Sequence, residues 1–297
     1  MDRRNFIVQS SIFGGSLFAA NSCNLFSPSS TYKMAYQLYS IRDEMERDVM
    51  GTLSALKVGG YQDFEVHGLN PDNNKIYGLS PQELKMRFDD LGLSISSGHY
   101  DFQNFLDGSK DVLLGFVDQC IQAAEVLGSE YLVFPWLSPT QRSIDYFKHL
   151  ALSLNVIGEK IKEAGLKLAY HNHDFEFTEQ GGEIGYDILL QETDVDKVFF
   201  ELDMYWLIFE SSLSPAKLIE DNPGRITMWH IKDMEANTRD FTELGNGIID
   251  YPKLLSAINK AGLEHFYIEQ DSNYSINSLE SAMSSASYFK KNLGKKI

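Results

Sequence analysis

The sequence predicts a single α/β domain folded as a (β/α)₈ barrel. Eight short apolar runs recur along the chain, and stretches with helical spacing separate them. Eight β–α units of this length favour a closed parallel barrel over a doubly wound sheet. No G-x-G-x-x-G follows the first run and no P-loop occurs, so the nucleotide-binding folds are not indicated. With 297 residues, 43% of them hydrophobic and 23% charged, the chain has the composition of a globular protein.

The first 22 residues have the features of a removable export signal. Arg3 and Arg4 precede an apolar stretch, and the order Arg-Arg-x-Phe-Ile is similar to a twin-arginine signal. Cys23 follows small residues and is a candidate for lipidation; the alternative is a plain cleaved signal with an incidental cysteine. We therefore expect a signal peptide over residues 1–22, a tether over 23–32 and the barrel over 33–297. The protein would be exported, as a periplasmic protein or a membrane-anchored lipoprotein.

The predicted strands are short runs rich in β-branched and aromatic residues. In order they are Met34–Leu38, Asp63–Val66, Leu93–Ser97, Tyr131–Phe134, Lys167–Tyr170, Val198–Leu202, Ile226–Ile231 and His265–Glu269. Between them, the clearest helical periodicity lies in Asp111–Leu127, with Cys120 on its apolar face and therefore in the core. The other predicted helices are Pro81–Leu91, Ile144–Ala164, Ser214–Ile219, Pro252–Ala261 and Leu279–Asn292.

Charge and composition exclude several classes of partner. The 42 acidic residues against 26 basic ones give a net charge of -16, which repels phosphate backbones, so we expect no nucleic-acid partner. No 18-residue apolar run occurs, and two cysteines cannot form a disulfide framework. The 34 tyrosine and phenylalanine residues provide enough aromatic mass for a large core and a sugar-sized pocket.

Polar side chains end four consecutive predicted strands. Because residues i and i+2 of a strand share a face, they form pairs at one end of the barrel. The pairs are His171 with His173, Glu201 with Asp203, His230 with Lys232, and Glu269 with Asp271. A single such residue is most simply structural, but packed carboxylates without a cation repel one another. The clusters therefore predict a divalent metal, and mixed imidazole and carboxylate ligands suit Mn²⁺, Co²⁺, Zn²⁺ or Fe²⁺.

The remaining strand ends supply candidate substrate contacts. Glu65, His67, His99 and Trp136 follow the second, third and fourth strands, and Trp136 could stack on a sugar ring. Gly245-Asn246-Gly247 follows the seventh strand, where barrels often bind phosphate, or it is simply a tight turn. The absence of a nearby Arg/Lys cluster argues against a phosphorylated substrate.

Four motifs resemble those of a known family. They are YHNHDFEF (170–177), ELDMYW (201–206), WHIKDM (229–234) and YIEQD (267–271). They are similar to the xylose isomerase-like TIM barrels, often described as sugar phosphate isomerases/epimerases, over roughly residues 33–295. The segment from Gln37 to Asp43 fits the same group, which makes Gln37 a candidate substrate contact. The resemblance implies metal ligands at His171, Asp203, His230 and Glu269. The family usually has Glu at the first of these positions, and His171 is more similar to inosose dehydratase.

These residues predict a divalent-metal-dependent sugar isomerase or epimerase. Glu269 would remove a proton next to a carbonyl through a metal-stabilised enediolate. His171 or His173 would be the acid or second base, and Lys232 would stabilise charge on oxygen or form a structural ion pair. The close alternative is a lyase or dehydratase acting on a keto-sugar, of the inosose dehydratase or keto-glycoside lyase type. A metal-dependent endonuclease and an inactive sugar-binding protein are further alternatives.

Overall fold

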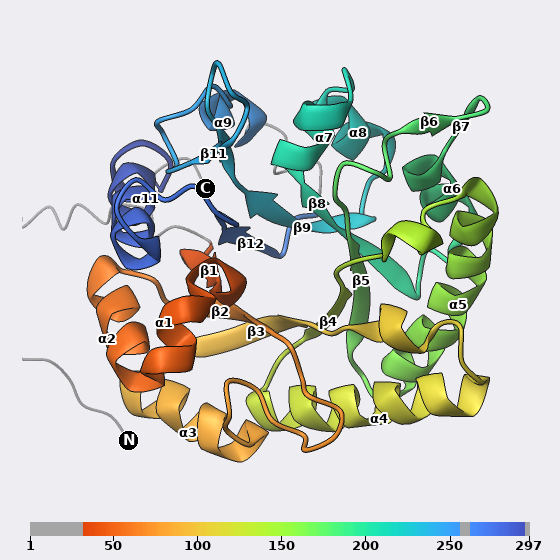
Figure 1. Cartoon of the computed structure of the whole chain (residues 1–297), viewed down its shortest axis with the longest axis horizontal. Coiled ribbons are helices and arrows are strands. Elements are labelled where there is room, and N and C mark those ends of the chain that lie inside the picture. The colour runs from red at the N-terminus through yellow and green to blue at the C-terminus, as the bar shows by residue number, and fades with distance from the viewer. Residues whose placement is uncertain (1–31, 256–261, 295–297) are drawn as a thin grey trace, which may run out of the picture.

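Eight parallel strands close into a barrel in the computed structural model, which describes residues 32–255 and 262–294 (Figure 1). In chain order the strands are β1 (Ala35–Gln37), β2 (Asp63–His67), β3 (Ser94–His99), β4 (Tyr131–Phe134), β5 (Lys167–His171), β8 (Val198–Asp203), β9 (Ile226–Ile231) and β12 (His265–Ile268). Each strand pairs with its neighbours in the sequence of barrel strands, and β12 closes onto β1. The predicted (β/α)₈ barrel is confirmed, with strand bounds that differ by one or two residues at most.

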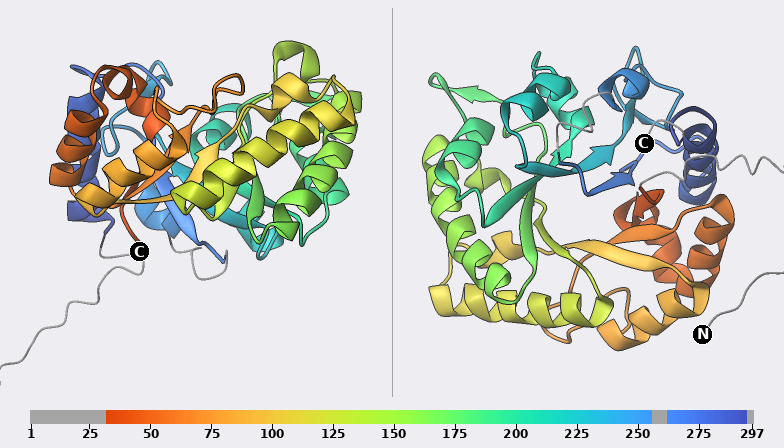
Figure 2. Two further views of the ribbon diagram at one scale, coloured as in Figure 1. Left: turned by 90° about the horizontal axis from the view of Figure 1, so that it is seen from below. Right: turned by 180° about the vertical axis from the view of Figure 1, so that it is seen from behind.

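Helices surround the barrel on its outside (Figures 1 and 2). They are η1 (Leu38–Ile41), α1 (Arg42–Arg47), α2 (Val49–Gly59), α3 (Pro81–Leu91), η2 (Phe102–Phe105), α4 (Lys110–Leu127), η3 (Pro139–Gln141), α5 (Ile144–Glu163), α6 (Gly185–Glu192), α7 (Met204–Glu210), α8 (Pro215–Asp221), α9 (Tyr251–Leu254) and α11 (Ser278–Asn292). Two small antiparallel sheets pair β6 (Glu179–Gln180) with β7 (Glu183–Ile184), and β10 (Asp233–Met234) with β11 (Phe241–Thr242).

Local sequence accounts for the ends of the predicted helices. Ser80 caps α3 through a capping box with Glu83, and Pro81 occupies its first turn. The helix ends where Gly92 adopts a left-handed conformation with φ 64°, which glycine reaches without a side-chain clash. In α4 the apolar face is buried and includes Cys120, so the prediction of a core cysteine is confirmed.

The sequence prediction omitted four helices, and the end of a fifth lies outside the described residues. α1, α6 and α7 have only six to eight residues, too few turns to show a clear period, and depend on packing for their stability. α2 was also omitted. The helix predicted at Pro252–Ala261 is described only from Tyr251 to Leu254. The predicted signal peptide and nearly all of the tether lie outside the described residues. Within the described residues, no helix combines the length and apolar character needed to cross a membrane.

The barrel interior has an apolar layer beneath a polar one. Ala35, Tyr131, Val133, Ala169, Met228 and Tyr267 form a small cluster of their own inside the barrel, separate from the large core between sheet and helices. Toward the carboxyl ends of the strands, the strand register sets polar residues side by side. His171 pairs with Glu201, and Asp203 pairs with His230. The barrel therefore gathers ionisable groups at one end, as the strand alternation predicts.

Candidate active site

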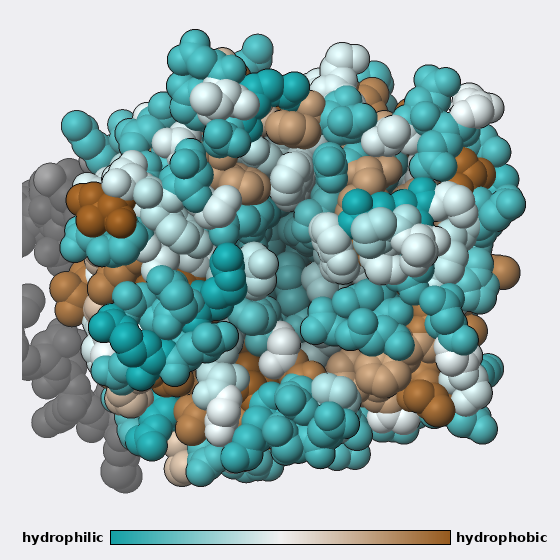
Figure 3. Space-filling model, viewed as in Figure 1, coloured by the Kyte–Doolittle hydropathy of each residue, from teal (hydrophilic) through white to brown (hydrophobic). Residues whose placement is uncertain are grey.

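A cavity of about 540 Å³ opens at the carboxyl ends of the strands. Figure 3 shows a hollow in the centre of the face seen along the barrel, surrounded mostly by hydrophilic residues. The residues lining the cavity are Tyr39, His67, Gly68, His99, Asp101, Pro135, Trp136, His171, His173, Trp206, Lys232, Phe241, Glu269 and Asp271. Of the predicted site residues, His67, His99, Trp136, His171, His173, Lys232 and Glu269 thus face this space.

The four predicted metal ligands lie together at the floor of the cavity. His171, Asp203, His230 and Glu269 each offer a ligand atom, and these atoms all lie within 4.8 Å of one another. All four residues are buried. His171 Nε2 lies 3.9 Å from Asp203 Oδ2, and His230 Nδ1 forms a short contact with Glu269 Oε2. Asp203 Oδ1 also accepts a hydrogen bond from Trp206 N–H at the start of α7, which fixes the carboxylate in place.

The buried ammonium of Lys232 lies among three carboxylates. Its nitrogen is 2.8 Å from Asp203 Oδ2, 2.8 Å from Glu269 Oε2 and 2.9 Å from Asp271 Oδ2. Burial alone would lower the pKa of Lys232, but the three carboxylates outweigh it and hold the pKa well above its usual value. Burial and the neighbouring carboxylates Glu269 and Asp203 raise the pKa of Asp271 to about 7, although Lys232 lowers it. Lys232 is therefore charged at neutral pH and balances part of the negative charge of the floor.

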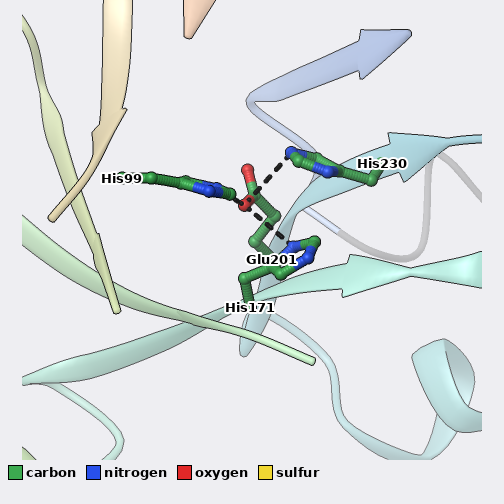
Figure 4. Close-up of side chains that lie close together, drawn as sticks. All are labelled: His99, His171, Glu201 and His230. Atoms are coloured by element: carbon green, nitrogen blue, oxygen red, sulfur yellow. Dashed lines mark hydrogen bonds and ion pairs between the residues drawn. The ribbon is translucent and has the colours of Figure 1, made fainter. Parts of the chain in front are cut away.

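A second group of imidazoles surrounds Glu201, one layer deeper (Figure 4). Glu201 Oε2 lies 2.9 Å from His99 Nε2, 3.2 Å from His230 Nε2 and 3.3 Å from His171 Nδ1. His171 and His230 therefore each direct one ring nitrogen to Glu201. The other nitrogen faces Asp203 in His171 and Glu269 in His230. Carboxylates in this position orient metal-binding histidines and fix their tautomers. The sequence placed Glu201 on the correct face, two residues before Asp203, but its role as a partner of three imidazoles was not predicted.

Gln37 and Glu65 differ from their predicted role as substrate contacts. Both are fully buried and lie outside the lining of the cavity. Gln37 Nε2 donates to Glu65 Oε2 at 2.6 Å, and Glu65 also accepts from Ser97 Oγ at 2.5 Å and contacts His230 Nε2 at 2.7 Å. The polar atoms of Gln37 and Glu65 bond to other side chains of the protein. The pair therefore helps to position the histidines, through the contact of Glu65 with His230.

Glu176 holds the loop that carries His173. Its carboxylate accepts hydrogen bonds from Tyr170 Oη at 2.6 Å and from the backbone N–H of His173 at 2.8 Å. Burial raises the pKa of Glu176 to about 8, although these two hydrogen bonds lower it. The last acidic residue of the YHNHDFEF motif is thus a positioning group beneath the cavity wall.

Glu176 should make the stability of the protein depend on pH. Because its pKa in the folded state lies above the unfolded value, its stabilising contribution is complete below about pH 4.5 and is lost as pH rises through about 8. We expect the unfolding free energy of the wild type to fall relative to that of Glu176→Gln between pH 5 and pH 8.5, by up to about 1.4 kcal/mol per pH unit. Denaturant titrations of both proteins at the two pH values measure this, and a difference that is constant or opposite in sign would contradict it.

The turn at Gly245-Asn246-Gly247 is not an open phosphate site. The carboxylate of Asp233 accepts hydrogen bonds from the backbone N–H groups of Gly245 (2.8 Å), Gly247 (3.1 Å) and Ile249 (3.2 Å). A Cβ on Gly247 would lie 2.2 Å from Asp233 Oδ1, so this close approach requires glycine. An internal carboxylate occupies the amides that a phosphate would use, which supports the tight-turn alternative.

The floor residues have the chemistry of a site for a divalent transition metal. Two imidazoles and two carboxylates form a suitable donor set. Burial lowers the pKa of His171 well below its usual value, so the ring is neutral, as a ligand must be. Its Nδ1 faces Glu201 Oε2 at 3.3 Å, which leaves Nε2 on the side of Asp203 as the nitrogen that would bind a metal. His230 differs, because Glu201 and Glu269 outweigh its burial and hold its pKa well above the usual value. A metal ion binding to His230 would therefore displace a proton.

Residues 53–292 match the family model described as xylose isomerase-like TIM barrel. The chain belongs to this family. The resemblance found in the four sequence motifs is thereby confirmed.

Solved structures and curated relatives agree with this assignment. A sugar phosphate isomerase/epimerase from Parabacteroides distasonis is similar over 90% of this chain and 96% of its own, with a TM-score of 0.79 and 28% identity. The IolI protein with a bound zinc atom has the same fold, with a TM-score of 0.71 and 17% identity over 89% of this chain and 99% of its own. Inosose dehydratase from Lacticaseibacillus casei is 29% identical over 147 residues, which are 43% of this chain and 48% of that protein. The chain thus spans about half the length of this curated relative.

Proposed function

We propose that the protein is a divalent-metal-dependent sugar isomerase or epimerase that moves a proton at a carbon next to a carbonyl. The main support is the buried cluster of His171, Asp203, His230 and Glu269 at the floor of an open cavity. The relatives are named as an isomerase/epimerase and a dehydratase, and both kinds of reaction can begin by removing such a proton.

The metal would be held by these four residues, and when bound it would supply Lewis-acid chemistry to a carbonyl oxygen. Mn²⁺, Co²⁺, Zn²⁺ and Fe²⁺ all suit the donor set. Lys232 lies at the same floor, where its ammonium can balance negative charge that develops on a substrate oxygen.

Glu269 and His173 are the proposed proton-transfer groups. Burial alone would raise the pKa of Glu269, but Lys232 and His230 outweigh it, so the carboxylate is ionised at neutral pH and able to accept a proton. Burial lowers the pKa of His173 well below its usual value and keeps its ring neutral, so the proton added to the opposite face would come from a water molecule held by His173, while Glu269 keeps the proton that it removed. Their strands, β12 and β5, are separated in the barrel by β9 and β8. The two groups therefore approach the cavity from different sides, as transfer of a proton between two faces of a carbon requires.

Proton exchange with solvent tests the proposal directly. Incubation with Mn²⁺ and a panel of keto-sugars in D₂O should give loss of the C–H signal next to the carbonyl and appearance of a new isomer or epimer by NMR. EDTA should abolish the exchange. Glu269→Gln should slow it by about 10²- to 10⁴-fold, the usual contribution of a general base.

Glu264→Gln is the matched control, because Glu264 lies at the opposite end of the same strand, paired with Lys167. It should exchange at the wild-type rate. Water loss or aglycone release in place of a new isomer would replace the proposal with the lyase alternative. Exchange that continues in the presence of EDTA would show that the reaction does not need the metal.

A further inference from the structure

Two aromatic side chains at the mouth of the cavity stand apart from all others in the described part of the chain. Tyr39 and Trp136 are 39% and 38% exposed, and every other described aromatic residue is more buried. Both line the cavity. Exposed aromatic surface that borders a cavity, rather than lying scattered over the molecule, is typical of a binding site.

Each of the two rings is held in place by an arginine and an imidazole. Arg42 Cζ lies 4.1 Å from the centroid of the Tyr39 ring, and Arg142 Cζ lies 4.4 Å from that of Trp136. His67 meets Tyr39 at 5.1 Å in an edge-on arrangement. His173 meets Trp136 in the same way at 4.7 Å. The rings are therefore preorganised, and little side-chain entropy is lost when a ligand stacks on them.

The positions of the two rings define an arc of the rim. Tyr39 belongs to η1, directly after β1, and Trp136 follows β4. Strands β2 and β3 lie between β1 and β4 in the barrel, and they end at His67 and His99. A ring held at this arc lies above these two imidazoles and to the side of the metal ligands on β5, β8, β9 and β12. The cavity volume of about 540 Å³ falls within the range of about 300–1,000 Å³ that is usual for small-molecule sites.

The charged groups around this arc disfavour an anionic ligand. The Arg42 guanidinium donates to the carbonyl oxygens of Tyr39 and Asp271, and that of Arg142 donates twice to the carbonyl of Leu137. Lys232 is already paired with three carboxylates. The carboxyl groups of Asp101 and Asp271 also line the cavity. A phosphate placed here would meet carboxylates, while these cations are engaged by the protein.

We infer that the rim between Tyr39 and Trp136 binds a second, uncharged ring, so that the substrate is a neutral keto-glycoside. This inference rests on the proposed function, since the keto-bearing ring would occupy the floor near Glu269 and Lys232. The ring attached through the glycosidic oxygen would stack on the rim aromatics. A free monosaccharide would leave the rim empty, and a sugar phosphate would meet Arg42, Arg142 and Lys232, which already have partners in the described part of the chain.

Binding of one-ring and two-ring probes tests the inference. Calorimetric titrations of the metal-loaded protein would compare methyl 3-keto-β-D-glucoside, 4-nitrophenyl 3-keto-β-D-glucoside and cellobiose oxidised at C3 of its non-reducing ring, with glucose 6-phosphate as the anionic probe. We expect both two-ring probes to bind at least about tenfold more tightly than the methyl glycoside. Tyr39→Ala and Trp136→Ala should each weaken the two-ring probes about five- to tenfold and the methyl glycoside less than twofold. Tyr39→Phe and Trp136→Phe, which keep an aromatic ring, should recover most of the loss.

The outcomes separate this inference from the proposed function. Any of four results would overturn the second-ring site. Two concern the neutral probes: equal affinity for one-ring and two-ring probes, or equal losses for all probes in the Ala variants. The others are tighter binding of glucose 6-phosphate and no binding of the two-ring probes. Ring-dependent binding without deuterium exchange would support the rim site and count against the isomerase. Deuterium exchange on the methyl glycoside, with no effect of the rim variants on binding, would support the isomerase and count against the rim site.

Discussion

Asp203→Asn should lower the affinity of the protein for a divalent metal by more than about 100-fold and reduce metal-dependent proton exchange to the same background as EDTA. Removal of a supporting residue near a metal typically costs 10–100-fold in affinity, and loss of a charged ligand should cost more. The substitution is nearly isosteric. Asn Oδ1 can still accept the hydrogen bond of Trp206 N–H that begins α7, so the backbone should remain in place.

Metal content of the purified protein and calorimetric titration with Mn²⁺ and Zn²⁺ measure this effect. Asp221→Asn is the matched control, because Asp221 is exposed and pairs only with Lys217 one helical turn away among the described residues. That variant should bind metal as the wild type does. Stoichiometric metal with unchanged affinity in Asp203→Asn would mean that Asp203 is not a ligand and that the proposed site is wrong.

Lys232→Met should destabilise the protein by about 3–5 kcal/mol, the usual cost of removing one partner of a buried ion pair. The three carboxylates of Asp203, Glu269 and Asp271 would remain without their shared ammonium. Because the pKa of Lys232 is raised on folding, its contribution is complete below the unfolded value of about 10.5 and is lost only at higher pH. The loss should therefore be present throughout the neutral range.

Denaturant unfolding in EDTA at pH 7 measures this cost without a competing metal ion. Lys217→Met makes the same change at an exposed pair, with 72% of the lysine side chain accessible, and should cost less than about 0.5 kcal/mol. A metal ion should restore part of the stability of Lys232→Met, because the ion can neutralise Asp203 and Glu269 in place of the lost ammonium. Equal losses in the two lysine variants would contradict the role of Lys232 as the counter-ion of the floor.

Strand ends could be predicted from the sequence because their signals are local. The alternation in Glu201-Leu202-Asp203 and His230-Ile231-Lys232 fixes which side chains face the interior, and closure of the barrel then brings them together. The same reasoning was incomplete for Glu65. A shift in the pairing of β2 with β3 between Phe64 and Glu65 places Glu65 opposite Ser97, beneath the cavity lining. A bulge of this kind leaves no reliable mark in a short strand.

Contacts between distant loops were beyond the reach of the sequence. Asp233 follows a predicted strand, and its partners lie 12 to 16 residues later in a turn that resembled a phosphate site. Tyr39 was part of a recognised motif, but its exposure depends on how η1 leaves the barrel and on the stacking of Arg42. These features arise from tertiary packing rather than from periodicity.

The division of the cavity between strands and loops has a consequence for divergence within the family. The proposed metal-binding and proton-transfer groups lie on the barrel strands or within two residues of their ends, so the strand register largely sets their positions. Tyr39 and Trp136 belong to connections that can change length or residue type at little cost to folding. Related chains could therefore change what the proposed rim site binds by remodelling these two connections, while the residues at the floor of the cavity stayed the same.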